Sequence, residues 1–164
     1  MSSIKRLNLF LLIIILILAT LKFLPKDSEY ASLTSISPDD IQSITLSSQH
    51  RQLVFKRNDG QWLFEPSPEQ AIEKETLSKL LGILKTHSYR QFENTENNLS
   101  AFGLNTPLYQ LTLDKLIIRF GVTDPVQHLR YVLLNDKIHL INDMYLQFFL
   151  ADEQFFFQKA DTEQ

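Results

Sequence analysis

The sequence predicts an α+β fold, in which a domain of antiparallel β-meanders with one main packed helix follows an N-terminal transmembrane helix. Three observations support this prediction. Two blocks of short segments alternate apolar and polar residues and are separated by turn sequences, as expected for strands with one buried face. One segment between the blocks has helical apolar spacing. An apolar run of 18 residues precedes both blocks.

The apolar run occupies residues 7–24 and follows Lys5 and Arg6. At about 1.5 Å per residue it spans roughly 27 Å, close to the ~30 Å hydrocarbon core of a bilayer. A cleaved signal peptide needs a small-x-small cleavage site, and Leu21 and Glu29 stand where small residues would be required. We interpret residues 7–24 as an uncleaved signal anchor. A cleaved signal peptide is the alternative, and a buried soluble helix is a third interpretation.

A short basic N-terminal arm normally stays in the cytoplasm. We therefore expect residues 1–6 to be cytoplasmic, and the protein to be a single-pass protein of a bacterial inner membrane with its C-terminal domain in the periplasm. Residues 25–40 are rich in Ser, Asp and Pro without periodicity, so we expect a tether there. The flexible-chain scale places the domain within roughly 20 Å of the bilayer. Residues 41–164 form the expected domain.

Charge and composition narrow the function classes. All 19 acidic residues follow Lys26, whereas four of the 16 basic residues precede Asp27, which leaves the exported part with a formal charge of about −7. An acidic domain without a basic patch disfavours nucleic acid as a partner. The chain has no cysteine, so neither a lipoprotein anchor nor thiol chemistry is available.

The first β block has strands expected at residues 41–47, 52–57 and 61–65, and Asn58-Asp59-Gly60 supplies a tight hairpin turn. Ile44 and Leu46 share one face of the first strand, Leu53 and Phe55 are expected to point inward, and the third strand carries Trp62 and Phe64. Pro66 and Pro68 end the third strand. Helical spacing then begins at Glu69, and its apolar face is formed by Leu77, Leu80, Leu81 and Leu84. This face is expected to pack on the sheet.

The second β block follows a polar connector at residues 94–100 and a Gly- and Pro-containing turn at 101–107. Its expected strands are residues 109–114, 116–120, 129–134 and 137–141. Asn142 or Asp143 can then cap a short helix over residues 144–150. The order of meander, helix, meander and helix suggests a duplicated meander-plus-helix unit, although no residue-level repeat accompanies it.

The chain resembles the DUF4340 domain family, which comprises bacterial membrane-anchored envelope proteins of unknown function. The resemblance covers residues 41–141 and rests on the anchor, the leucine-rich helix and several short motifs. These motifs are NDGQWLFEP at residues 58–66, LSAFGLNTP at 99–107, IRFG at 118–121 and RYVLL at 130–134. The family is similar in domain content to accessory proteins of ABC-type transport systems, including auxiliary components linked to gliding motility. The resemblance implies no catalytic residues.

No catalytic, cofactor or metal site is expected. The histidines His50, His87, His128 and His139 lack the spacing of a metal-binding motif. The acidic pairs Asp39-Asp40 and Asp152-Glu153 are typical of helix starts or solvated loops rather than of a catalytic pair. No nucleophile elbow, phosphate loop or dinucleotide-binding signature occurs.

Four other residues are candidates for ligand contact or for core packing: Trp62, Phe102, Leu104 and Tyr131. Trp62 is expected to pack on the helix rather than to stack on a ligand. Phe102 and Leu104 are expected to close the core beneath the connector, and a partner contact is the alternative.

The C-terminal segment contains the candidate partner surface, which consists of Phe148, Phe149, Phe155, Phe156 and Phe157. Two interpretations are open. The five rings could be the last element of the core, or they could form an exposed apolar patch that docks a membrane protein or another subunit.

These observations predict a non-enzymatic, membrane-anchored periplasmic accessory or scaffold subunit of an envelope or transporter complex. Its expected partners are a membrane protein, such as an ABC-type transporter, and the lipid bilayer through residues 7–24. The sequence leaves homo-oligomerisation open. The alternative is a periplasmic binding module that holds a small apolar or glycan ligand, with Trp62 and Tyr131 as contacts.

Overall fold

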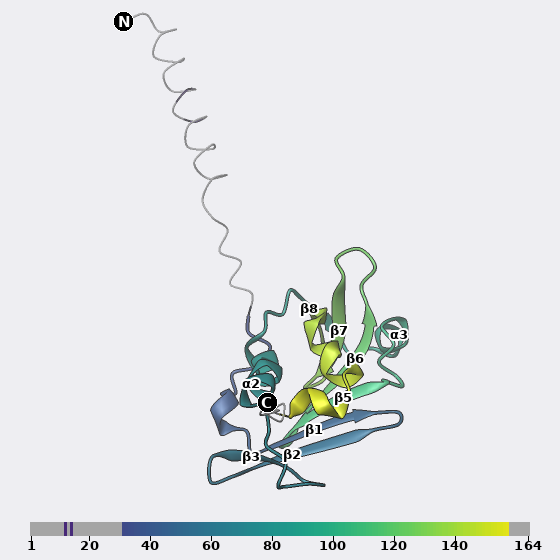
Figure 1. Cartoon of the computed structure of the whole chain (residues 1–164). Helices are drawn as coiled ribbons and strands as arrows, with labels where there is room; N and C mark the ends of the chain where they lie inside the picture. The colour runs from purple at the N-terminus through teal and green to yellow at the C-terminus, as the bar shows by residue number, and fades with distance from the viewer. Residues whose placement is uncertain (1–11, 13, 15–30, 158–164) are drawn as a thin grey trace, which may run out of the picture.

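A computed structural model describes residues 31–157 together with Leu12 and Ile14. The expected cytoplasmic arm, the rest of the expected anchor and residues 158–164 lie outside the described residues. Among the residues described, no helix has the length and apolar character needed to cross a lipid bilayer. Residues 31–157 form an α+β unit (Figure 1), which confirms the predicted class.

Within residues 31–157 the strands form one eight-stranded sheet in the order β3-β2-β1-β5-β6-β7-β8-β4. They are β1 (Ser43–Ser48), β2 (Gln52–Asn58), β3 (Gln61–Phe64), β4 (Arg90–Glu93), β5 (Tyr109–Leu113), β6 (Leu116–Thr123), β7 (Leu129–Leu134) and β8 (Lys137–Asn142). Every neighbouring pair is antiparallel. The two predicted meanders are joined where β1 pairs with β5, with Leu46 opposite Leu111. The predicted antiparallel pairing is therefore confirmed, whereas duplication of a meander-plus-helix unit stays a prediction.

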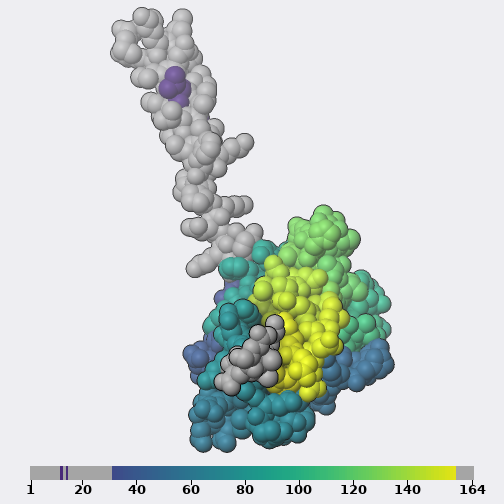
Figure 2. All heavy atoms as spheres, viewed as in Figure 1, coloured from purple at the N-terminus to yellow at the C-terminus, as the bar shows by residue number. Residues whose placement is uncertain are grey.

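One face of the sheet is covered by helical segments from two parts of the chain. They are α2 (Lys74–Leu81), the 3-10 helices η2 (Gly82–Lys85), η3 (Asp143–Leu146) and η4 (Glu153–Phe156), and α4 (Gln147–Leu150). Figure 2 shows the C-terminal segment, in yellow, on the surface beside the teal region that contains α2. The backbone N–H of Glu73 donates to the carbonyl of Phe156 at 2.9 Å. The main core lies between this layer and fully buried sheet residues such as Ile44 and Phe55.

A shorter helix, α3 (Glu96–Ala101), lies over the opposite face. Because side chains alternate along a strand, Leu133 points away from the face that carries Val132 and Leu134. Leu133, Ile138 and Leu104 form a second, smaller buried cluster on this side, against which Leu99 of α3 packs.

Both predicted hairpin turns have the expected backbone geometry. Asp59 and Gly60 have φ of 48° and 79°, and Asn135 and Asp136 have φ of 47° and 59°. These positive values belong to the left-handed region that the tightest hairpin turns require, which Asn, Asp and Gly enter most readily.

The helical parts of the sequence differ in extent from their prediction. Helix α2 begins at Lys74 rather than at Glu69, because the Glu73 side chain accepts a hydrogen bond from the Glu75 backbone N–H at 3.4 Å and caps the helix there. The polar connector at residues 94–100 is not a loop, since Thr95 Oγ1 accepts from the Asn98 N–H at 3.3 Å and starts α3. Strand β4 was not predicted.

The prediction of a tether over residues 25–40 is wrong for residues 31–40. Leu33 is buried, and its N–H donates to the carbonyl of Thr86 at 2.8 Å. The N–H of Ser88 donates to the carbonyl of Ala31 at 3.0 Å, and Pro38–Asp40 forms a 3-10 helix, η1. Residues 31–40 therefore belong to the folded unit, which leaves only residues 25–30 between the expected anchor and the first residue of the continuous structure.

Candidate interaction surface

The opposite face of the sheet carries three half-buried aromatic rings, which we call the aromatic surface: Phe92, Phe102 and Tyr131. Phe102 and Tyr131 are stacked, with ring centroids 3.9 Å apart and ring planes 6° apart. The Phe92 ring lies 5.2 Å from that of Phe102, in a tilted arrangement, and 5.7 Å from that of Tyr131, in an edge-on arrangement. Such contacts fix ring positions beyond what burial alone provides.

Strand pairing explains why rings from three separate segments meet. Phe92 of β4 lies opposite Ile138 of β8, and Ile138 in turn lies opposite Leu133 of β7. Tyr131 precedes Leu133 by two residues, so both side chains leave the same face. The aromatic surface thus rests on Leu133 and Ile138, which are buried beneath it.

The third ring comes from the turn after α3, and glycine makes its position possible. The backbone N–H of Val122 donates to the Phe102 carbonyl at 2.9 Å. A Cβ on Gly121 would lie 2.1 Å from that carbonyl oxygen, which is closer than any real contact. Gly103 has φ of 67° and lies against Val122. The Phe-Gly-Leu motif and the glycine of the IRFG motif are therefore two halves of one backbone contact.

A β-bulge in β6 accompanies this contact. Phe120 lies opposite Val132, but the next pair joins Thr123 to Arg130, so β6 has one extra residue. Bulges increase the local twist and redirect side chains. Because of the bulge, the Gly121 carbonyl needs a hydrogen-bond donor from the main-core side of the sheet.

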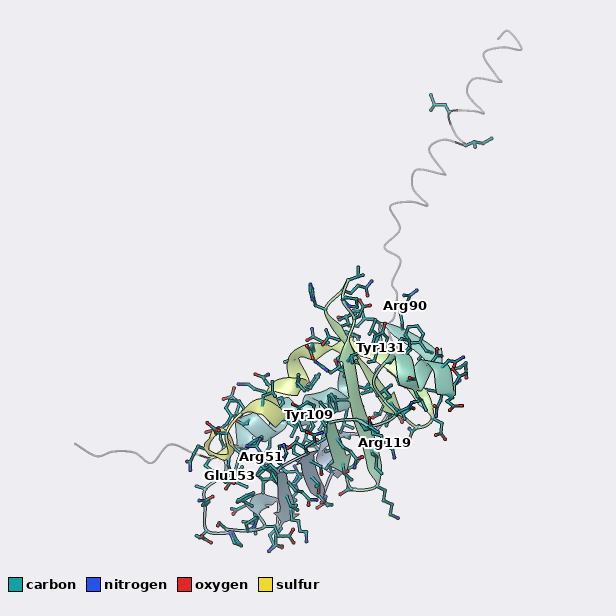
Figure 3. The ribbon with its side chains drawn as sticks, turned by 90° about the vertical axis from the view of Figure 1, so that its right-hand side faces the viewer. Arg51, Arg90, Tyr109, Arg119, Tyr131 and Glu153 are labelled. Carbon is teal, nitrogen blue, oxygen red and sulfur yellow. The ribbon has the colours of Figure 1, made fainter. Side chains whose placement is uncertain are left out.

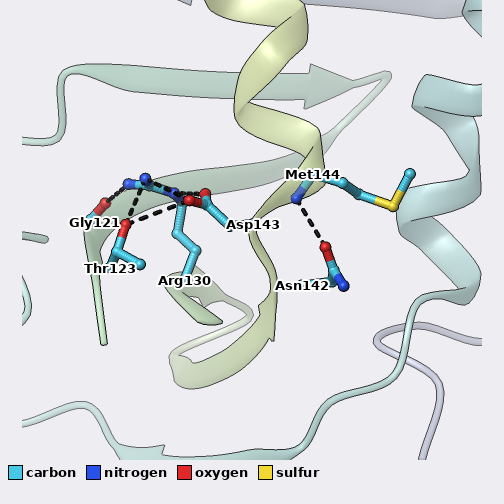
Figure 4. Close-up of polar contacts among 6 residues, drawn as sticks. All are labelled: Gly121, Thr123, Arg130, Asn142, Asp143 and Met144. Carbon is cyan, nitrogen blue, oxygen red and sulfur yellow. Dashed lines mark hydrogen bonds and ion pairs between the residues drawn. The ribbon is translucent and has the colours of Figure 1, made fainter. Parts of the chain in front are cut away.

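Arg130 supplies that partner (Figure 4). Its Nη1 donates to the Gly121 carbonyl, its Nη2 donates to Thr123 Oγ1 at 2.7 Å, and its Nε pairs with the carboxylate of Asp143. Arg130 is only 8% exposed, and a buried guanidinium is tolerated only when it is paired and hydrogen-bonded. This network joins β6, β7 and η3 directly behind the aromatic surface.

Two opposite charges border the aromatic surface. The Arg90 guanidinium lies 5.9 Å from the centroid of the Phe92 ring, within the range of a cation–π contact. The Tyr131 hydroxyl donates to Asp124 Oδ1 at 3.4 Å. Burial, and then the carboxylate of Asp124, raise the pKa of the Tyr131 hydroxyl above its usual value, so it remains a neutral hydrogen-bond donor at physiological pH. Figure 3 shows Arg90 and Tyr131 at the same end of the sheet.

A surface depression lies beside this region. It has a volume of about 610 Å³ and is lined by Tyr89, Arg90, Gln127 and Leu129. Arg90 is the first residue of β4 and Tyr89 precedes it, whereas Gln127 lies in the turn between β6 and β7 and Leu129 begins β7. The depression is wide and open to solvent, which suits a side chain of a partner better than an enclosed small molecule.

The structure brings some of the predicted candidates together and separates others. Phe102 and Tyr131 form the stacked pair, and Leu104 is buried beneath them, as the core interpretation expects. Trp62 is far from them in the fold. It is 9% exposed within the main core, and the Arg57 guanidinium covers its ring at 4.8 Å. Trp62 is therefore a core residue and not an open stacking platform.

The predicted partner surface of C-terminal phenylalanines needs a correction. Phe148, Phe149 and Phe156 are buried in the main core, where Phe156 contacts Phe55 at 5.2 Å between ring centroids. Phe157 is half-buried, and only Phe155, at 45%, is exposed. The prediction of a docking patch is therefore wrong for Phe148, Phe149 and Phe156. These residues instead complete the layer that covers the sheet.

The candidate titratable groups are dispersed. His50, His87, His128 and His139 come from different parts of the fold, and in residues 31–157 no group of three or more His, Asp or Glu could hold a metal ion. Asp39-Asp40 lie in η1, and Asp152-Glu153 lie at the start of η4. His139 is buried, with its Nδ1 2.9 Å from Ser88 Oγ.

Sequence reasoning missed Phe92, Arg90 and the Arg130–Asp143 pair. Arg130 carried a usable signal, because it occupies an inward position in an otherwise apolar strand, where a charged residue needs a partner. Phe92 carried none, since strand β4 is short and mostly polar.

Comparison with known proteins finds no matching family model, no similar curated protein and no similar solved structure. The resemblance to the DUF4340 family stays a prediction from its motifs.

Proposed function

We propose that this chain is a non-enzymatic, membrane-anchored accessory or scaffold subunit of a bacterial envelope assembly, with residues 7–24 in the inner membrane and the α+β domain in the periplasm. The observation that supports this proposal best is the aromatic surface of Phe92, Phe102 and Tyr131, bordered by Arg90. Aromatic residues and arginine are the residue types that most often dominate the energy of protein interfaces.

The aromatic surface is also preorganised. The Phe102–Tyr131 stack, the hydrogen bond from Tyr131 to Asp124 and the Gly121 contact hold the rings in place before any partner arrives. A partner that packs on fixed rings loses little side-chain entropy, so more of the contact energy becomes affinity.

The position of the aromatic surface favours a partner at the membrane. Ala31, where the continuous structure begins, accepts a hydrogen bond from Ser88, and Arg90 follows two residues later. The six residues 25–30 reach at most about 20 Å when fully extended. An anchor at residues 7–24 would keep this end of the domain near the bilayer, so the partner we propose is a membrane protein. The DUF4340 resemblance supports a subunit of an ABC-type transport system.

A second candidate function is a periplasmic binding module for a small apolar or glycan ligand. It is supported by the depression of about 610 Å³, where Tyr89 and Arg90 provide ring and guanidinium surfaces. Tyr131 remains a candidate contact for this function, whereas Trp62 does not.

Affinity purification of the full chain from its native membranes in mild detergent tests the proposal. We expect the wild-type chain to retain a specific membrane protein, which is lost from a Tyr131→Ala/Arg90→Ala double variant. An Ile117→Ala variant is the matched control, because Ile117 is an exposed residue at the far end of β6. Retention of the same partner by the double variant would contradict the proposal, and a bound small molecule without a protein partner would favour the binding module.

A further inference from the structure

The β6–β7 hairpin projects from the same end of the domain at which the continuous structure begins. The first residue of β4, Arg90, lies opposite Leu140 near the end of β8, and Asn142 at that end lies opposite Leu129 at the start of β7. The hairpin tip, residues 124–128, immediately precedes Leu129. Figure 1 shows the hairpin extending beyond the neighbouring strands on that side of the domain.

Strand lengths explain the projection. Strand β5 begins at Tyr109, opposite Phe120, whereas β6 continues for three more residues to Thr123. The tip therefore lies beyond the end of both neighbours, β5 and β8, and its residues 125–128 are exposed.

The tip carries two exposed apolar residues, Pro125 and Val126. Val126 is 81% exposed, the highest value among the large apolar residues of the described chain, and Pro125 precedes it. Exposed apolar side chains at the end of a narrow projection bury nothing within the domain. At a membrane interface they would leave water for the acyl boundary, as the apolar faces of interfacial segments do.

Three backbone donors of the tip and its one carboxylate have hydrogen-bond partners within the domain. The Asp124 carboxylate accepts from the Gln127 N–H at 2.7 Å and from the Tyr131 hydroxyl. The N–H of His128 donates to the Asp124 carbonyl at 3.0 Å, and the N–H of Asp124 donates to the Leu129 carbonyl at 2.6 Å. Internal satisfaction of backbone donors lowers the cost of leaving water.

The surroundings of the tip resemble those of residues that lie at headgroup level. Tyr89 and Arg90 line the depression beside the tip, together with Gln127 and Leu129. Tyrosine rings are enriched at membrane–water interfaces, and arginine pairs with phosphate oxygens.

We propose that the tip of the β6–β7 hairpin, with Pro125 and Val126 at its apex, is a second membrane contact that inserts into the headgroup region of the bilayer holding the anchor. This inference rests on the proposed function, because residues 7–24 must bring the domain to the membrane. Two points of attachment would fix the orientation of the domain and direct the aromatic surface sideways, along the plane of the membrane.

The absence of cysteine from the sequence makes a direct test simple. The full chain with the substitution Val126→Cys is labelled at that cysteine with a nitroxide. It is then reconstituted into vesicles of phosphatidylethanolamine and phosphatidylglycerol. Ile117→Cys, at the opposite end of β6, is the matched control, since Ile117 is also an exposed apolar residue. Label accessibility is measured with oxygen, which concentrates in lipid, and with a water-soluble nickel chelate. Vesicle flotation is measured on the same samples, and Trp62 emission checks folding.

The expected result is that both labelled chains float with the vesicles, and that the label at 126 gains oxygen accessibility and loses nickel accessibility relative to the label at 117. Equal nickel accessibility at both sites in floating chains would overturn the inference while leaving the anchor intact. Failure of the chain to float would overturn the anchor itself. The label at 126 could instead be accessible to the nickel chelate in lipid vesicles but shielded from it in native membranes. That result would mean that the tip contacts a protein partner, and it would contradict the lipid contact.

Discussion

The guanidinium of Arg130 and the carboxylate of Asp143 form an ion pair between β7 and the start of η3, with Nη2 3.3 Å from Oδ2. The Arg130 side chain is almost fully buried, whereas about a third of the Asp143 side chain is exposed. The pair ties the bulge of β6 to the segment that carries the C-terminal phenylalanines, so it connects the aromatic surface to the main core.

Breaking this pair should destabilise the domain strongly, because the remaining charge would be left without its partner. We expect Asp143→Ala to lower the free energy of unfolding by about 3 kcal/mol. The exposed Lys137–Glu93 pair is the matched control, and Glu93→Ala should cost less than about 1 kcal/mol. Urea unfolding followed by Trp62 fluorescence measures both. Equal losses for the two variants would contradict the structural role assigned to Arg130.

Gly121→Ala should displace the turn that carries Phe102. The new Cβ would collide with backbone rather than with a flexible side chain, so relief requires movement of the whole turn. We expect a loss of more than about 2 kcal/mol in unfolding free energy, together with loss of near-ultraviolet circular dichroism from the stacked rings. At Gly60 a Cβ meets open space, and Gly60→Ala should cost about 1 kcal/mol from its positive φ alone. A near-ultraviolet spectrum unchanged by Gly121→Ala would show that the turn tolerates a side chain at this position.

Two neighbouring phenylalanines separate core from surface in the C-terminal segment. Phe156 is fully buried against Phe55, whereas Phe155 is about half exposed. Phe156→Ala should therefore cost about 3–5 kcal/mol of unfolding free energy, and Phe155→Ala should cost roughly 1 kcal/mol or less. Chemical denaturation of the two variants, compared with wild type, provides the measurement. If Phe155→Ala were the more damaging change, the burial of this segment would be wrong.

His139 should make the domain sensitive to acid. Burial first, and the nearby Lys137 second, lower the pKa of His139 below its ordinary value, and its Nδ1 contacts the Ser88 hydroxyl. Because protonation is easier in the unfolded chain, the stability contributed by neutral His139 is fully present above about pH 6.5 and is lost as pH falls through the lower folded pKa.

The test compares unfolding free energies at neutral and mildly acidic pH. We expect His139→Gln to flatten the decrease towards acid relative to wild type. An identical pH dependence in wild type and His139→Gln would contradict a contribution of His139 to the acid sensitivity of the domain.

Much of the fold could be predicted because local signals agreed with the tertiary structure. Alternation placed Leu53 and Phe55 inward, and Asn135-Asp136 marked a hairpin turn, as the structure confirms. The local signals failed where the structure depends on pairing with residues that are distant in the sequence. Strand β4 exists because the edge of β8 offers hydrogen bonds, and residues 31–40 are ordered because Leu33 fills a site beside Thr86. Neither partner is local in sequence.

The candidate site was only partly predictable for the same reason. Phe102 and Tyr131 were identified as candidates, but nothing in their spacing showed that they stack. The crowded phenylalanines at the C-terminus suggested more apolar rings than a small domain could bury. The wide sheet nevertheless provides room for Phe148, Phe149 and Phe156. The half-buried aromatic surface lies on the other face of the sheet.

Site-specific photo-crosslinking at Tyr131 tests the central claim most directly. The full chain, expressed in its native cells with a benzophenone amino acid at position 131, should crosslink to one membrane protein, and the same group at position 117 should not. Crosslinking to that protein is expected to disappear when Gly121→Ala displaces the Phe102 turn. Absence of any crosslink at 131 in membranes that contain the chain, or equal crosslinking at 117, would contradict the assignment of this surface to a membrane partner.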